Sequence, residues 1–288
     1  RGQQADHATD EGEVDLQNGE LVLNKFSVES VTLQIWDDTD VVADETFNAE
    51  AGAGIALQTT GAFNIDQVEA EGIVRLQATG SIIDINNTDG TVAISTSGDL
   101  ILLSETGFIA GSEVVGQVVR SAMQIHVYPG RLSAQATGDI IIEQLTSDLR
   151  ISQVDSGGVV MIKVLDGNMY VGKIISGNYV DLKAPKGSLL DIFDDADLPS
   201  DNIVAPIIGN VYLHSGPGGN IGSATNFLEV WIKEGELTSY SEGDTFVHSL
   251  ADLYVESMTS LNGNITLQVD GDAYIDKFIA NSGIVAIN

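Results

Sequence analysis

The sequence has no cysteine, and its 12 lysines and arginines stand against 42 aspartates and glutamates. The absence of cysteine excludes disulfide bonds and thiolate metal sites. The scarcity of basic residues gives a net charge of −30, which disfavours binding to nucleic acid and to anionic lipid surfaces. The plainest interpretation of this acidity is solubility.

Long apolar runs are missing as well, because no segment approaches the roughly 20 residues of a membrane-spanning helix. No sustained 3.6-residue periodicity is present, so amphipathic helices are not expected. The opening RGQQADHATD lacks the pattern of a signal peptide, and the closing GIVAIN falls within a strand pattern. We therefore expect this sequence to be a segment of a longer chain.

Short alternating runs separated by glycine turns dominate the sequence, as in GNITLQVDGDAYIDKFIANSGIVAIN (263–288). Gly243, Gly263 and Gly283 lie 20 residues apart. Period-2 alternation predicts strands with one buried face, so Ile265 and Leu267 should point inward, as should Val160 and Ile162. The pattern predicts an all-β chain folded as a parallel β-helix (β-solenoid), with about 20 residues per rung.

A longer repeat is superimposed on the short one. GSIIDINNT (80–88) returns as GSLLDIFDD (187–195), and GVVMIKV at 158 returns as GNITLQV at 263, about 105 residues later. We predict one continuous solenoid made of repeat units at the boundaries 1–53, 54–157, 158–262 and 263–288, the first and last being partial. Each unit should hold about five rungs and display its loops on one side.

The G-(D/N)-φ-x-φ pattern resembles the haemagglutinin-type repeats of filamentous bacterial adhesins. GGNIGSATNFLEV (218–230) is similar to a GxIGTxxNPLEV motif of giant repetitive bacterial surface proteins, with Phe227 where that family has proline. The resemblance implies a right-handed parallel β-helix in an exported, cell-surface or fibre-forming protein. It identifies no receptor.

These features favour a structural or adhesive segment of a large extracellular bacterial surface protein, acting as a stiff rod and not as an enzyme. Expected partners are further copies of its own repeat, self-associated fibres, or cell-surface glycans or proteins, without nucleic acid or membrane insertion. One alternative is a carbohydrate-active β-helix enzyme, a polysaccharide lyase or hydrolase, which non-repeating acids and bases gathered in one groove would favour. Another is a subunit of an extracellular filament, sheath or surface layer.

No catalytic or cofactor-binding residues are predicted. Two acidic clusters are interpreted as solvated loops, with calcium binding as the alternative because carboxylates are its preferred ligands. The clusters comprise Asp37, Asp38 and Asp40, and Asp194, Asp195 and Asp197.

The histidines share no metal-ligand spacing and are interpreted as outward-facing or hydrogen-bonded strand residues; they are His7, His126, His214 and His248. Trp36, Tyr128 and Trp231 occupy corresponding segments. They could form exposed platforms for sugars, but we favour stacking on their repeat mates or covering of the edge of a rung.

Overall fold

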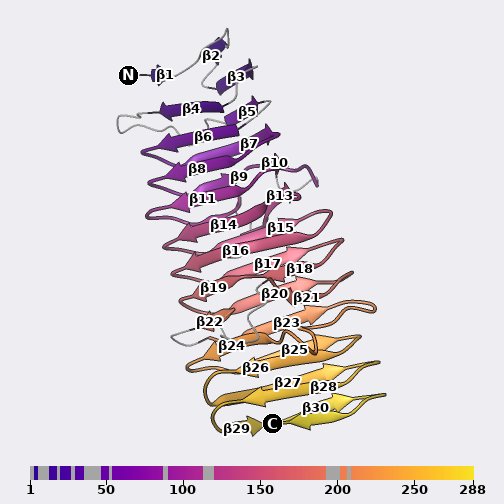
Figure 1. Cartoon of the computed structure of the whole chain (residues 1–288). Helices are drawn as coiled ribbons and strands as arrows, with labels where there is room; N and C mark the ends of the chain where they lie inside the picture. Colours follow the sequence, from indigo (N-terminus) through magenta and orange to yellow (C-terminus); the bar gives the residue numbers. More distant parts are fainter. Residues whose placement is uncertain are drawn as a thin grey trace. The chain divides into compact units, whose positions relative to one another are not determined.

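The computed structural model, whose strands are labelled in Figure 1, divides into two compact units, residues 1–145 and 146–288. The described residues are 3–5, 13–17, 20–26, 30–35, 47–51, 54–86, 90–112, 120–192, 202–205 and 209–288. Within these ranges the chain forms strands and turns and no helix, which confirms the all-β prediction. Accordingly, the described part contains no helix long and apolar enough to cross a membrane.

In unit 1 the strands alternate between two sheets. Sheet A contains β1 (Gln3–Ala5), β4 (Ser30–Ile35), β6 (Gly54–Thr59), β8 (Val74–Ala78), β11 (Leu100–Ser104) and β14 (Arg131–Ala136). Sheet B contains β2 (Glu13–Gln17), β3 (Glu20–Phe26), β5 (Phe47–Ala51), β7 (Phe63–Ala70), β9 (Ile82–Asp84), β10 (Ile94–Thr96), β12 (Ile109–Gly111), β13 (Met123–Val127) and β15 (Ile140–Gln144).

Unit 2 has the same two-sheet arrangement. Its sheet A contains β16 (Leu149–Ser156), β18 (Met169–Val171), β19 (Lys173–Ser176), β21 (Leu189–Asp191), β22 (Ile203–Ala205), β24 (Leu228–Ile232), β26 (Thr245–Ser249), β28 (Ile265–Val269) and β31 (Val285–Ile287). Its sheet B contains β17 (Val160–Val164), β20 (Val180–Ala184), β23 (Val211–Ser215), β25 (Leu237–Ser241), β27 (Leu253–Ser260), β29 (Ala273–Ile275) and β30 (Phe278–Ala280). The pairings described within unit 2 are parallel, as in β17–β20 and β26–β28.

Near the N-terminus the pairing departs from the predicted parallel pattern. Strands β2 and β3 are antiparallel, with Gln17 opposite Glu20, and β1 is antiparallel to β4. Only Asn18-Gly19 separates Gln17 from Glu20 in the sequence, and Asn-Gly is the pair most typical of two-residue hairpin connections. A local turn signal therefore outweighs the parallel repeat at this point.

Apolar columns form the buried face of unit 2. Val160, Val180 and Val211 are in register on β17, β20 and β23, and each is fully buried. Burying a side chain of this size stabilises the fold by about 1.5–3 kcal/mol. The inward orientation predicted for Val160, Ile162, Ile265 and Leu267 is confirmed, since none is more than 1% exposed.

A ladder of asparagine and aspartate side chains connects successive turns of unit 2. The backbone N–H of Asp244 donates to Oδ1 of Asn220 at 2.8 Å, and the N–H of Asn264 donates to Oδ1 of Asp244 at 2.7 Å. The N–H of Ile284 then donates to Oδ1 of Asn264 at 2.9 Å. Each side chain thus satisfies a turn amide that has no strand partner of its own.

The regularly spaced glycines are required by close stacking of the turns. A Cβ atom at Gly283 would collide with the carbonyl oxygen of Gly263, and neither glycine has a positive φ. The 20-residue glycine spacing therefore follows from the contact of one turn with the next and not from a left-handed backbone.

The 105-residue repeat exchanges the two sheets. Strand β17, which begins after Gly158, lies in sheet B, whereas its repeat equivalent β28, after Gly263, lies in sheet A. Along the described strands the chain changes sheet nine times between β17 and β28. A repeat therefore spans four and a half two-strand rungs, and repeat-equivalent strands lie in different sheets.

Candidate functional site

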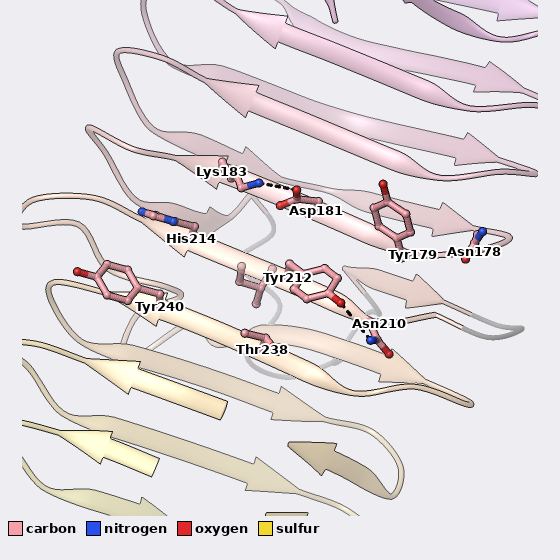
Figure 2. Close-up of a pocket in the computed structure, with 10 residues that line it drawn as sticks. Asn178, Tyr179, Asp181, Lys183, Asn210, Tyr212, His214, Thr238 and Tyr240 are labelled. Atoms are coloured by element: carbon pink, nitrogen blue, oxygen red, sulfur yellow. Dashed lines mark hydrogen bonds and ion pairs between the residues drawn. The ribbon is translucent and has the colours of Figure 1, made fainter. Parts of the chain in front are cut away.

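A groove with a volume of about 580 Å³ lies on the outer face of sheet B in unit 2. Strands β20, β23 and β25 form its floor, and Figure 2 shows their outward side chains side by side. We call this feature the tyrosine groove. Its main lining residues are Tyr179, Asp181, Lys183, Asn210, Tyr212, His214, Thr238 and Tyr240.

Parallel register arranges the lining residues in two columns. Asp181, Tyr212 and Thr238 occupy one column, and Lys183, His214 and Tyr240 occupy the other. Neighbouring strands lie about 4.8 Å apart, so residues in one column are cross-strand neighbours. Three short strands thus bring together residues that are far apart in the sequence.

An ion pair occupies one end of the groove. Nζ of Lys183 lies 2.6 Å from Oδ2 of Asp181, two residues away on the same face of β20 (Figure 2). Asp181 is only 9% exposed, and within the described part of the chain its Oδ1 atom is buried without a hydrogen-bond partner. A buried carboxylate oxygen without a partner is costly, and a ligand hydroxyl could satisfy it.

His214 is a half-buried neutral base in the second column. Its ring centroid lies 5.0 Å from that of Tyr240, with the two planes tilted by 47°. Burial lowers the pKa of His214 below its ordinary value, the charge of Lys183 lowers it further, and Asp181 opposes both effects. The imidazole is therefore uncharged at neutral pH.

Two tyrosines of the groove are held by neighbouring side chains. The rings of Tyr179 and Tyr212 meet edge to face, with centroids 6.3 Å apart and planes at 82°. Nδ2 of Asn210 donates to the hydroxyl oxygen of Tyr212 at 3.1 Å, and the hydroxyl of Tyr179 donates to Sδ of Met161 at 3.3 Å. These contacts hold the rings in place before any ligand binds.

The outer face of sheet B carries two more tyrosines beyond the groove. Tyr254 on β27 and Tyr274 on β29 are in register and are 52% and 47% exposed. Five of the seven tyrosines of the chain therefore lie on strands β23, β25, β27 and β29 or directly before β20, all in sheet B of unit 2.

Among the described residues singled out from the sequence, only His214 lines the groove, and His7 falls outside the described residues. Both aspartate clusters, 37–40 and 194–197, fall outside the described residues, as does Trp36. His214 lines the groove, whereas His248 is buried on β26 with Nε2 3.0 Å from Oδ1 of Asp270. Among the described residues, no three histidine, aspartate or glutamate side chains are grouped so as to hold a metal ion.

The two remaining aromatic candidates are exposed. Trp231 on β24 is 36% exposed, and Tyr128, which follows β13, is 48% exposed. Trp231 lies in sheet A of unit 2, whereas β13 belongs to sheet B of unit 1. Trp231 and Tyr128 thus correspond in the repeat but belong to different sheets, as β28 and β17 do.

The sequence repeat does not predict the groove, because the residues that line the groove are not repeated. Asp181 and Lys183 correspond to Arg75 and Gln77 in the preceding repeat, and His214 corresponds to Leu103. The only signal in the sequence was the placing of polar aromatic residues at outward positions of YVDLK, NVYLH and LTSY. Comparison with known proteins finds no match to the chain among protein families, curated proteins or solved structures.

Proposed function

We propose that the chain is a right-handed parallel β-helix that serves as a structural and adhesive segment of a large extracellular bacterial surface protein or fibre. The observation that supports this proposal is the unbroken parallel stacking in sheet B of unit 2, from β17 to β27. Each interior strand there pairs through its backbone N–H and C=O groups with its two neighbouring strands. Such a stack can be extended by adding rungs without altering those already present.

The composition agrees with this role. Most inward positions are apolar, and most of the acidic residues that give the net charge of −30 are absent from the core. A surface of one sign keeps long stacked molecules soluble and apart. Under the proposal, the tyrosine groove is the surface that contacts the adhesive partner.

The cellular part of the proposal is tested by labelling intact cells of the source organism with antibodies against residues 146–288. Labelling without permeabilisation is expected. Labelling only after permeabilisation would contradict an extracellular location. The β-helix itself is tested by structure determination of the segment at high resolution, where antiparallel pairing between β17 and β20 would contradict it.

A carbohydrate-active enzyme is the second candidate, favoured by the groove itself. Asp181, Lys183 and His214 meet there and are not repeated elsewhere, which is the arrangement expected of an enzyme. A neutral histidine beside a lysine could abstract a proton from a uronate, as in lyase chemistry. Incubation with uronate polysaccharides tests for lyase activity, because the unsaturated product of a lyase absorbs ultraviolet light. If the absorbance increases with the wild-type protein but not with His214→Gln, the enzymatic function would replace the non-enzymatic proposal.

A further inference from the structure

We infer that the tyrosine groove binds a neutral oligosaccharide that runs across strands β20, β23 and β25. The inference rests on the proposed function insofar as it takes the outer face of sheet B as the adhesive surface. It adds the chemical class of the ligand and the direction in which that ligand lies.

The composition of the groove matches the surface of a sugar. The rings of Tyr179, Tyr212 and Tyr240 offer apolar faces on which the C–H faces of a pyranose can pack. Asn210 and Thr238 also line the groove. The amide of Asn210 already donates to Tyr212 and accepts from the N–H of Glu236, but its second N–H remains for a sugar. The hydroxyl of Thr238 donates to Glu256, which leaves its oxygen able to accept. Sugar hydroxyl groups need partners of both kinds.

Asp181 provides the strongest single indication of a hydroxyl ligand. Its Oδ2 atom is occupied by Lys183, while Oδ1 is buried and has no partner among the described residues. The side chain of Lys183 is 44% exposed, so it can move aside and open access to the carboxylate. A sugar hydroxyl that donates to Oδ1 would satisfy this acceptor, which the fold leaves open beside the groove.

Charge favours a neutral ligand over an acidic one. Asp181 and Lys183 neutralise each other, and the lowered pKa of His214 keeps its ring uncharged at neutral pH. The rest of the chain contributes a net charge of −30, which repels uronates and sulfated glycans. An uncharged groove on an acidic protein is complementary to an uncharged chain.

The spacing of the strands sets the direction of the ligand. A pyranose unit and the gap between neighbouring strands are of similar size, about 5 Å, so successive sugars can follow successive strands. Tyr254 and Tyr274 lie on the same outer face, on β27 and β29. Affinity should therefore increase with chain length up to about five sugar units, one for each of the five strands.

Isothermal titration calorimetry on the whole chain tests the inference. The titrants are the neutral hexaoses of glucose (α- and β-linked), mannose, galactose and xylose, with hexagalacturonate as the anionic comparison. We expect at least one neutral hexaose to bind and Tyr212→Ala and Tyr240→Ala each to weaken it by about tenfold or more. Asp181→Asn should also weaken it, whereas Tyr170→Ala, a tyrosine on β18 in sheet A, should leave it unchanged.

Three results would overturn the inference: no binding of any neutral hexaose, tighter binding of hexagalacturonate, or equal loss in the Tyr170→Ala control. Circular dichroism on every variant separates these results from misfolding. Because binding is measured on purified protein, its failure would leave the extracellular location untouched. Equally, intracellular labelling in the antibody experiment would leave saccharide binding untouched.

Discussion

The rings of Tyr254 and Tyr274 stack face to face on the outer side of sheet B, with centroids 4.5 Å apart and planes within 10° of parallel. The stacking is a direct result of parallel register, which pairs Tyr254 with Tyr274 on adjacent strands. The negative charge of Asp272 raises the pKa of Tyr274 above its ordinary value, and the phenolate form of Tyr254 adds the next largest contribution.

This aromatic pair should be energetically coupled. In a double-mutant cycle of Tyr254→Ala and Tyr274→Ala, we expect a coupling free energy of about 0.5–1.5 kcal/mol in urea unfolding. A coupling indistinguishable from zero would show that the rings are adjacent without stabilising each other. The same cycle between Tyr254 and Tyr170, which lie in different sheets, should give no coupling and serves as control.

The side-chain ladder makes a second prediction. Asp244→Ala should destabilise the fold by about 0.5–1.5 kcal/mol, because the N–H of Asn264 loses its acceptor. Asp276→Ala removes an exposed carboxylate outside the ladder and should change stability by less than about 0.5 kcal/mol. Thermal melting of both variants checks the difference. Equal changes in melting temperature would mean that the loss of a negative charge, and not the loss of the hydrogen bond, determines the effect of Asp244→Ala on stability.

The assignment of strand faces is tested on β28. Leu267 is fully buried, whereas its neighbour Thr266 is half-buried on the outer face. Leu267→Asp should unfold the neighbouring strands, because a charge would be buried without a partner. Thr266→Asp should fold with nearly unchanged circular dichroism. If both variants melt alike, the faces are assigned wrongly.

His214 makes stability depend on pH. Its pKa in the folded state lies below the unfolded value of about 6.5, so protonation favours the unfolded chain. The free energy of unfolding should therefore decrease as the pH falls below about 6.5. Below the pKa of His214 in the folded state, this residue should cause no further decrease. His214→Gln should remove this component between pH 7 and 5.5, measured by urea unfolding. An unchanged pH profile in the variant would rule out the effect.

Ions provide the last prediction. A net charge of −30 implies repulsion between rungs, so salt should raise the melting temperature by screening. If the clusters Asp37-Asp38-Asp40 and Asp194-Asp195-Asp197 are solvated loops, calcium and magnesium at equal ionic strength should act alike. A calcium-specific rise at about a millimolar or below, lost in Asp194→Asn with Asp195→Asn, would identify a site instead.

Local patterns were sufficient to predict the strands and their buried faces. Alternation in ITLQV marks Ile265 and Leu267 as inward, and both are fully buried. The glycine spacing likewise anticipated the stacked turns at Gly263 and Gly283. The Asn18-Gly19 pair is the sequence signal for the antiparallel pairing of β2 and β3, and the repeat pattern alone does not predict that pairing.

Sequence patterns were enough to predict the all-β class and the inward side chains, because both depend on residues close together in the chain. The repeat length can be read directly from the sequence. Which residues lie next to each other across the sheet depends on the three-dimensional packing. Asp181, Tyr212 and Thr238 are neighbours because the parallel register stacks β20, β23 and β25, whose separations along the chain differ. Equivalent strands of successive repeats lie in different sheets because the chain passes from one sheet to the other an odd number of times within a repeat. That number depends on where the chain turns and on how its strands pack.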